Sequence, residues 1–359
     1  ARFAGGEPML QFRAMQRVYT EAVRRCAAHG VRFSAAVLTN GTVVPDGAPE
    51  WVAAQGIGLS ISIDGLGEIQ DRMRPKLGGG GSFDLLERGV AKWRSAGLRP
   101  YVLITVGESN LDGLEALTAW LLEQGLAFRY SLVRDLEWGT GDLADQRGAQ
   151  RCGDLRPDTF DSGILSGPAL DRVRATFHRC YDLIEANVGA QVDAGQQVVP
   201  PFRATHHCCD LSLWRPIPKA CGAGDNYLAI GDSGGLSPCQ AALHGSGDAK
   251  LAADVPLDVQ LQAHKPFGAF TRKAGNDTCN RCRHKPSCAG GCPLLLHRRE
   301  GHIDGRSPYC EVFRAVIPRI LRIAALEQIG RRNQALRDQR APPSDATAAL
   351  DSKPNGAAS

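Results

Sequence analysis

The stretch CNRCRHKPSCAGGC, residues 279–292, places four cysteines in fourteen positions, with gaps of two, five and three residues between them. Seven of the chain's twelve cysteines fall between residues 221 and 310, so the thiols are crowded into one part of a 359-residue sequence. Crowded cysteines in a long chain without a secretory signal are typical of metal binding rather than of a disulfide scaffold. The sequence therefore predicts that these sulfur atoms hold a metal centre.

Zinc and iron–sulfur clusters are the two metal centres that suit such thiols. Structural zinc favours two well-separated CxxC-like pairs, or mixtures of cysteine and histidine. In this chain the second pair, Cys288 and Cys292, has a different spacing from the first, and Cys221, Cys239 and Cys310 remain as further single ligands. An iron–sulfur cubane needs four thiolates that converge from loops, and glycine-rich connections let the backbone wrap the cluster. The spacing favours iron–sulfur clusters over zinc.

Three short motifs near the start of the chain could bind a small molecule: FAGGEP at 3–8, LTNGT at 38–42 and SISIDG at 60–65. Gly5 and Gly6 allow the backbone to approach a ligand closely, and exposed carbonyl groups there can accept hydrogen bonds from an ammonium group. Each motif alone is a weak signal, since a glycine pair before Glu-Pro also makes a plain turn. Their order, one strand–helix unit apart, makes them specific together.

The two sets of motifs together resemble radical S-adenosylmethionine (SAM) enzymes of the peptide- or protein-maturase type, which carry a C-terminal SPASM domain. CAGGCP at 288–293 and SPYCE at 307–311 resemble the SPASM domain, and this resemblance covers residues 221–313. FAGGEP, LTNGT and SISIDG resemble the SAM-binding strand ends of the radical SAM barrel, and EIQDRMRP at 68–75 resembles the branch with SPASM domains. The resemblance implies SAM as a cofactor, together with two auxiliary 4Fe–4S clusters.

In the SPASM family the ligands of the two auxiliary clusters interleave along the chain. Carried over to this sequence, one cluster is held by Cys279, Cys282, Cys288 and Cys310, and the other by Cys221, Cys239 and Cys292. The fourth ligand of the second cluster is Cys209 or Cys208, or its iron site is open. The resemblance also implies that SAM contacts Gly5, Gly6, Glu7, Pro8 and Asn40, that Ser62 binds its methionine carboxylate, and that Asp64 shapes the loop beyond.

One family motif, the CxxxCxxC that binds the catalytic 4Fe–4S cluster, does not occur in the sequence. It belongs to the loop after the first barrel strand, which would precede residue 1. We interpret this as a missing N-terminal segment that carries the third cluster, with degenerate loss of the site as the alternative. The chain by itself is then expected to be inactive in SAM cleavage.

The resemblance implies that reductive cleavage of SAM gives a 5′-deoxyadenosyl radical, which abstracts a hydrogen atom from a peptide. The leading hypothesis is an oxidoreductase-type maturase that forms a carbon–carbon or thioether crosslink in a ribosomally made peptide, with no catalytic side chain assigned. Its expected partners are a peptide or protein substrate and a reducing flavodoxin or ferredoxin.

Two alternative functions remain open at this point. The first is an anaerobic sulfatase-maturing, formylglycine-forming enzyme. That family places an aspartate after the equivalent of Cys239, where this chain has Gln240, which cannot take up a proton at neutral pH. The second alternative is a non-catalytic iron–sulfur electron-transfer or scaffold protein, which would have no need of SAM motifs.

Helices and strands alternate along the first 135 residues and position these motifs. Helices are predicted at 11–30, around 50–55, at 83–95 and at 111–122, and strands at 31–39, 58–63, 100–106 and 126–133. The first helix should place Met15, Val18, Ala22 and Cys26 on one face. Strands separated by helices predict right-handed βαβ units and a parallel sheet. With the resemblance, the fold class is α/β: a partial (β/α)6 barrel without its first strand, followed by a small cysteine-rich SPASM domain.

The expected domains are the partial barrel at 1–135, a connecting loop and helix at 136–206, the SPASM domain at 207–315, a C-terminal helix at 316–340 and a disordered tail at 341–359. The connecting helix is predicted at 167–188, and the last helix from near residue 311 with a bend at Pro318. The tail is polar and rich in proline and alanine, a composition that does not bury a core.

Composition and charge exclude several other classes of protein. The formal net charge of +4 is spread along the chain and falls short of a nucleic-acid-binding signature. The arginine-rich stretch 314–340 indicates the solvated face of a helix or, alternatively, a docking site for an acidic partner. No run approaches the roughly 20 apolar residues of a membrane span and no signal peptide is present, so we expect a cytoplasmic protein without membrane partners. Arg129, Tyr130 and Arg134 either face a substrate or are ordinary outward positions.

Overall fold

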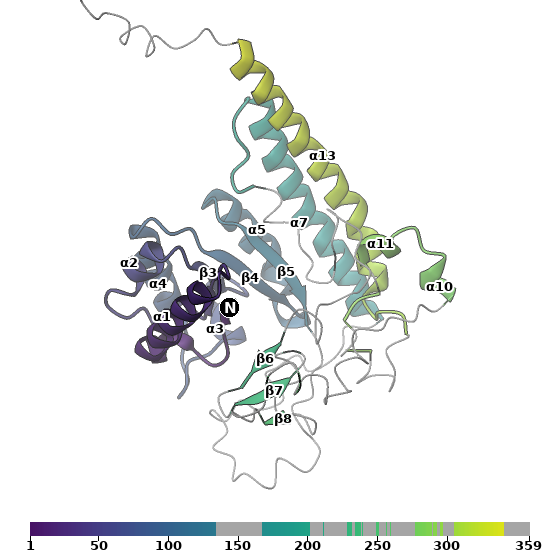
Figure 1. Cartoon of the computed structure of the whole chain (residues 1–359). Helices are drawn as coiled ribbons and strands as arrows, with labels where there is room; N and C mark the ends of the chain where they lie inside the picture. The colour runs from purple at the N-terminus through teal and green to yellow at the C-terminus, as the bar shows by residue number, and fades with distance from the viewer. Residues whose placement is uncertain are drawn as a thin grey trace, which may run out of the picture.

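A five-stranded parallel sheet forms the centre of the structure, a computed structural model that describes residues 1–133, 167–201 and 305–340 and shorter segments between, including 228–231, 234–237, 277–288 and 290–292. The strands are β1 (Arg2–Phe3), β2 (Ala36–Thr39), β3 (Gly58–Ser62), β4 (Tyr101–Val106) and β5 (Phe128–Leu132) (Figure 1). They lie side by side in the order in which they occur along the chain. This sequential order confirms the predicted α/β partial barrel.

Helices connect each strand of the sheet to the next. They are η1 (Pro8–Gln11) and α1 (Phe12–Ala28) after β1, α2 (Ala48–Ala54) after β2, α3 (Glu68–Met73) and α4 (Phe83–Ser95) after β3, and η2 (Glu108–Gly113) and α5 (Leu114–Glu123) after β4. Because crossovers between parallel strands are right-handed, a sheet with sequential strand order carries these helices on one face. The helix α4 spans the residues predicted for it, whereas the helix predicted at 111–122 begins with the 3-10 turns of η2.

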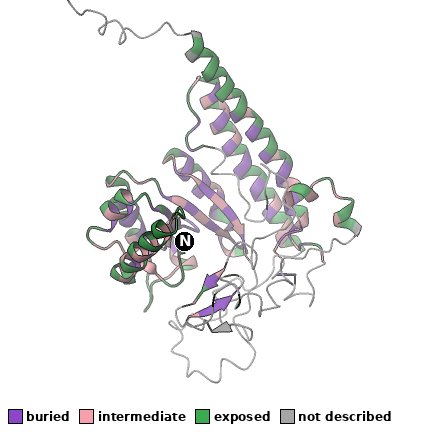
Figure 2. Ribbon diagram, viewed as in Figure 1, coloured by how far each residue is buried: buried purple, intermediate pink, exposed green. Residues whose placement is uncertain are grey.

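Burial alternates along the strands and distinguishes the two faces of the sheet (Figure 2). Val37, Ile61 and Ile104 have no exposed surface and belong to the main hydrophobic core, beneath the helices. The side chains between the buried positions are partly exposed and mostly small or polar: Ala36, Leu38, Ser60, Ser62, Tyr101, Leu103, Thr105, Arg129 and Ser131. In a barrel this second face lines the interior, so its side chains are not needed for packing the main hydrophobic core.

Two long helices, α7 (Pro168–Asp193) and α13 (Cys310–Arg340), lie side by side beyond α5 and β5 (Figure 1). The carboxylate of Glu185 on α7 lies 3.2 Å from Arg319 and 2.6 Å from Arg322 on α13. The helix α7 is longer than the sequence predicts, because it continues beyond residue 188. The helix α13 starts at Cys310, next to the predicted start near residue 311, and continues through Pro318.

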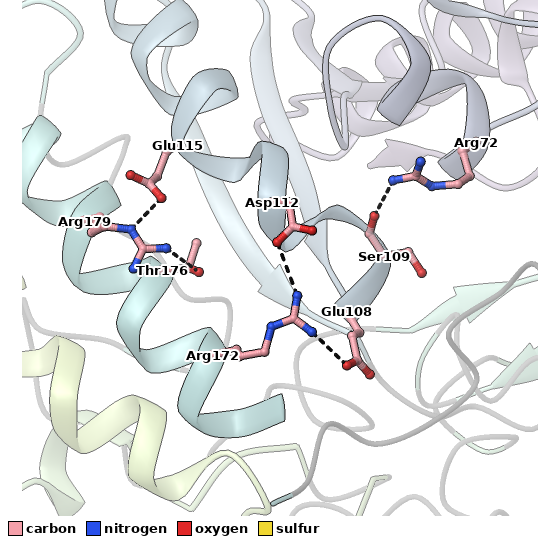
Figure 3. Close-up of polar contacts among 8 residues, drawn as sticks. All are labelled: Arg72, Glu108, Ser109, Asp112, Glu115, Arg172, Thr176 and Arg179. Carbon is pink, nitrogen blue, oxygen red and sulfur yellow. Dashed lines mark hydrogen bonds and ion pairs between the residues drawn. The ribbon is translucent and has the colours of Figure 1, made fainter. Parts of the chain in front are cut away.

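Ion pairs also join α7 to η2 and α5 (Figure 3). Arg172 lies 3.1 Å from Glu108 and 3.2 Å from Asp112, and Arg179 lies 2.6 Å from Glu115. All of these side chains are more than a third exposed, and surface pairs of this kind contribute about 0–1 kcal/mol each. The apolar side chains buried between α5 and α7 therefore hold the helices together, and the ion pairs fix their relative orientation.

The cysteine-rich part of the chain contains a small antiparallel sheet and two short helices. The strands are β6 (Ala229–Ile230), β7 (Gly235–Ser237) and β8 (Ala249–Lys250), and the helices are α10 (Asp277–Asn280) and α11 (Lys285–Cys288). The predicted domain boundaries stay predictions, and the predicted tail at 341–359 lies outside the described residues. Over the part of the chain that the structure describes, no helix has the length and apolar composition for crossing a bilayer.

Candidate SAM pocket and metal centre

The three motifs predicted to bind SAM follow three neighbouring strands. The GGEP segment begins two residues after the end of β1, Asn40 comes directly after β2, and Ser62 is the last residue of β3. Because the strands are parallel, their carboxyl ends lie at one edge of the sheet, which is where barrel enzymes bind their ligands. The structure therefore brings the three motifs together at the edge that a cofactor would occupy.

Glu7 connects the first motif to the second. One carboxylate oxygen accepts hydrogen bonds from the Thr39 hydroxyl at 2.7 Å and from the Met9 amide at 3.0 Å. The other oxygen accepts from the Asn40 amide at 2.7 Å. The Asn40 side chain then accepts from the amide and hydroxyl of Thr42, at 2.9 and 2.7 Å. Glu7 thus positions the backbone of both motifs, a structural role that motif recognition alone did not predict.

Gly5 and Gly6 leave their backbone open to a ligand. Their φ angles are +92° and +50°, in the left-handed region that favours glycine. Both residues are exposed, and a Cβ built on either would meet no atom of the described residues within 4 Å. The glycines are therefore required by backbone conformation and not by packing, as expected of a turn that presents its amide and carbonyl groups to a bound molecule.

Asp64 holds the ends of β3 and β4 together. Its side chain is 3% exposed and lies 2.6 Å from the Nε atom of Arg74. The other carboxylate oxygen accepts from the Thr105 amide at 2.7 Å, and the Asp64 backbone bonds the side chains of Gln70 and Asn110, each at 2.7 Å. These contacts give Gln70 and Arg74 of the EIQDRMRP motif a physical role, which is to fix the loop after β3.

Ser62 and Arg129 lie at the same level of the partly exposed sheet face, since both are paired in register with Leu103. The Nε atom of Arg129 is buried and has no hydrogen-bond partner among the residues that the structure describes. Burial raises the pKa of Tyr101 to about 12, although the positive charge of the Arg129 guanidinium lowers this pKa. This face thus combines a serine, a tyrosine and a cation, groups that suit a polar ligand.

Tyr130 is a core residue, so the reading in which it faces a substrate is wrong. It is fully buried on the helix-covered face of β5, and its hydroxyl lies 2.7 Å from that of Thr118. Burial raises the pKa of Tyr130 well above its usual value. The alternation of Phe128, Tyr130 and Leu132 on one face was the signal available in the sequence. Arg134 lies outside the described residues.

Four cysteines line one cavity of about 380 Å³ beside the N-terminus of α13. They are Cys279 of α10, Cys282 in the following turn, Cys288 of α11 and Cys310, the first residue of α13. This is the set that the SPASM resemblance assigns to one cluster. All four are half-buried, so a group held there would lie close to the surface.

The glycine pair between Cys288 and Cys292 separates these two cysteines. Gly290 and Gly291 have φ angles of +90° and +86°, in the left-handed region that favours glycine. Both cysteines pack against the main hydrophobic core, but Cys288 lines the cavity and Cys292 does not. Its sulfur therefore has a different environment from that of Cys288, as expected if the two belong to different metal centres.

The donor set at the cavity fits an iron–sulfur cubane. A cubane is held by four thiolates placed around it, and four thiols line this cavity. Among the described residues, no three histidine, cysteine, aspartate or glutamate side chains form a group that could hold a single metal ion.

Cys239 is one of the predicted ligands of the second cluster. It is half-buried and lies two residues after β7. Cys221, Cys208 and Cys209 lie outside the described residues, as does Gln240. The predictions for the second cluster therefore stay predictions.

A hydrogen bond joins the cysteine cavity to the sheet. The hydroxyl of Tyr309, the residue before Cys310, donates to the carbonyl oxygen of Val133, which directly follows β5. Tyr309 is fully buried, and its amide donates to the Ser307 hydroxyl at 3.2 Å. The SPYC motif thus attaches the cavity to the same edge of the sheet at which the SAM motifs end.

The comparisons with known proteins agree with this geometry. No protein-family profile matches the chain. An uncharacterized protein of Archaeoglobus fulgidus is 22% identical over 329 residues, covering 90% of this chain and 69% of the relative. The serine-type anaerobic sulfatase-maturating enzyme of Klebsiella aerogenes is 24% identical over 299 residues, covering 82% of this chain and 66% of the relative. The chain thus spans about two thirds of the length of these relatives.

Two solved structures share the fold. Native anSMEcpe with bound AdoMet and the Cp18Cys peptide matches 90% of this chain and 85% of its own, with a TM-score of 0.65 and 15% identity. SuiB of Streptococcus suis bound to the precursor peptide SuiA matches 86% of this chain and 64% of its own, with a TM-score of 0.53 and 14% identity. Both are radical SAM/SPASM enzymes. The chain has the fold of this class, which confirms the resemblance seen in its motifs.

Proposed function

We propose that the protein is a radical SAM/SPASM maturase that acts on a ribosomally made peptide, through hydrogen-atom abstraction, to form a carbon–carbon or thioether crosslink. The observation that carries the proposal is the joint placement of two features. Three SAM motifs follow adjacent parallel strands, and a cavity lined by four cysteines is attached to the same sheet edge through Tyr309. The structures of SuiB with its precursor peptide and of anSMEcpe with AdoMet support the choice of a peptide substrate.

The chain's own residues would bind and orient SAM. The open backbone of Gly5 and Gly6 would receive its ammonium group, and the Ser62 hydroxyl would donate to its carboxylate. Glu7 and Asp64 act indirectly, because each holds the loop that carries a contacting residue. The iron–sulfur clusters, when bound, supply one-electron chemistry. We also propose that the protein's reducing partner is a flavodoxin or ferredoxin and that the protein is cytoplasmic.

Sulfatase maturation is a second candidate, favoured by the similarity to the Klebsiella aerogenes enzyme and to anSMEcpe. The residue after Cys239 is evidence against sulfatase maturation. That position is Gln240, and an amide cannot serve as the general base that the resemblance assigns to an aspartate there. A crosslink and a formylglycine differ in product mass. Mass spectrometry of the treated peptide therefore distinguishes the two activities.

SAM binding by the iron-reconstituted protein tests the proposal against a non-catalytic scaffold. We expect calorimetry to detect binding, and the substitution Ser62→Ala to weaken it by the loss of one hydrogen bond to a charged group, about 1.5–3 kcal/mol. Ser60→Ala is the matched control, because Ser60 lies on the same strand and face but not at the strand end. Absence of SAM binding, or equal effects of the two substitutions, would contradict the proposed site.

The substrate class needs a separate experiment. The full-length reconstituted enzyme would be incubated with SAM, a reductant and the short peptide encoded beside its gene. We expect 5′-deoxyadenosine together with a peptide that has lost two hydrogen atoms. An unchanged peptide mass would count against the crosslinking maturase.

A further inference from the structure

Positive charge surrounds the cavity that the four cysteines line. Besides those cysteines, the cavity is lined by the side chains of Arg281, Arg283, Lys285, Arg306 and Arg314, which we call the basic rim, and it has no acidic residue among its described lining. Four of the five rim residues are exposed; Lys285 is half-buried and donates to the Asn280 side chain. The rim is therefore a charged surface available to a partner.

A second hollow of about 490 Å³ continues the basic rim along the start of α7 and α13. It shares Arg283 and Arg314 with the cavity and adds Arg174. Its two acids are already paired: Asp171 lies 2.9 Å from Arg174, and Glu311 contacts Arg306 and Arg314. Among their described lining residues, the two hollows together carry six cations and two acids, an excess of four that equals the formal net charge of the whole chain, +4.

The rim lies away from the SAM motifs. In Figure 1, α10 and α11 lie beside the start of α13, on the opposite side of the long helices from α1 and the N-terminus. A peptide that must reach the ends of β1, β2 and β3 has no need to cover this surface. A partner that docks here would instead lie next to the four half-buried thiols.

We propose that the basic rim is the docking surface for an acidic electron-carrier protein, which it brings next to the metal centre held by Cys279, Cys282, Cys288 and Cys310. The inference rests on the proposed function, since it takes that centre to be an iron–sulfur cluster. Concentrated charge of one sign attracts a partner of the opposite sign and orients it before contact. Arg174, Arg306 and Arg314 are paired with Asp171 and Glu311, whereas Arg281 and Arg283 form no ion pair with an acidic side chain among the described residues, so their charge is available to a partner.

The test measures the affinity of the iron-reconstituted protein for purified flavodoxin, used as the acidic probe, without SAM. We expect the double substitution Arg281→Glu and Arg283→Glu to weaken binding by about tenfold or more. Arg99→Glu with Arg332→Glu is the matched control, because these exposed arginines make the same change in net charge away from the rim. Binding by the native chain should also weaken as salt rises from about 50 mM to about 300 mM.

Several outcomes would overturn the docking surface: no binding by the native chain, binding that is insensitive to salt, unchanged binding in the rim variant, or equal losses in the rim and control variants. Iron content is measured on each preparation. If the glutamate variant has lost iron, the milder Arg281→Gln and Arg283→Gln variant replaces it and should show a smaller loss of affinity. A lack of SAM binding would overturn the proposed function. SAM binding is measured in a separate experiment, because the docking measurement contains no SAM.

Discussion

The carboxylate of Glu7 accepts a hydrogen bond from the Thr39 hydroxyl at 2.7 Å, although Glu7 follows β1 and Thr39 is the last residue of β2. Thr39 is 2% exposed, so its hydroxyl has no access to water as an alternative partner. The first two SAM motifs are thus a single hydrogen-bonded unit. A change at Glu7 should affect the position of Asn40, which its second carboxylate oxygen holds through the backbone.

Replacement of Glu7 by alanine should destabilise the fold and weaken SAM binding together. The substitution leaves the buried Thr39 hydroxyl and two amides without their acceptor, at a cost of about 1–3 kcal/mol. Urea denaturation gives the change in the free energy of unfolding. Glu87→Ala, at an exposed position of α4, is the control and should change it by less than about 0.5 kcal/mol. Equal stabilities of the two variants would show that the Glu7 contacts contribute nothing.

Asp64 should matter more for stability than any exposed acid. Asp64→Ala removes the partner of Arg74 and the acceptor for the Thr105 amide, a loss of about 3 kcal/mol. Asp64→Asn retains an acceptor and should cost less. Asp46→Ala, at an exposed position, serves as the control. Thermal unfolding of the three variants should follow this order, and a stability of Asp64→Ala equal to that of Asp46→Ala would contradict it.

The cysteines around the cavity should behave as one group in iron binding. If both auxiliary clusters form, the reconstituted chain should hold about eight irons, and Cys282→Ser or Cys288→Ser should remove about four of them. Cys292→Ser should instead affect the other cluster, because its side chain does not line this cavity. The double variant of Cys288 and Cys292 should therefore lose nearly all iron. Zinc in place of iron after anaerobic purification would refute the assignment.

Cys180 should be unreactive toward alkylating agents in the folded protein. Burial raises its pKa to about 11, so almost no thiolate is present at pH 8. Cys26 is half-buried and should react under the same conditions. Peptide mapping after treatment with iodoacetamide distinguishes the two, and denaturant should make both reactive. Because the raised pKa keeps the proton bound only in the folded state, the contribution of Cys180 to stability is lost as pH rises from about 9 toward 11.

The sequence predicted the strand–helix rhythm well because the apolar residues repeat at the correct intervals. The residues of α4 matched their prediction, and every predicted strand is present. The first helix shows where prediction from the spacing of apolar residues fails. Met15 is buried, but Val18, predicted on the same face, is 58% exposed, because Phe12 and Tyr19 pack against the core instead. Hydrophobic character alone did not decide which residues turn inward.

The site was predicted from its motifs, whereas the contacts that hold it were not. Asn110 bonds the carbonyl of Asp64 from 46 residues away, and Tyr309 reaches Val133 across 176. Neither pair has a local sequence signal, because such contacts depend on how the elements pack. The grouping of Cys288 with Cys310 and its separation from Cys292 came from the family resemblance. In the structure, Cys288 and Cys310 line the cavity and Cys292 does not, and the left-handed backbone of Gly290 and Gly291 lies between Cys288 and Cys292.

The pairing of α7 with α13 has a consequence for how the chain folds during synthesis. Each strand of the sheet pairs with the strand next to it along the chain, so the sheet can assemble as soon as those residues leave the ribosome. The helix α7 cannot complete its packing then, because the partner of its second apolar side is α13, the last described element. Until residues 310–340 emerge, Val192, whose side chain lies against Gly330 of α13, lies on an uncovered surface, where chaperones or another nascent chain can bind. A stop codon before α13 should therefore yield an aggregating protein in which the five sheet strands are nevertheless present.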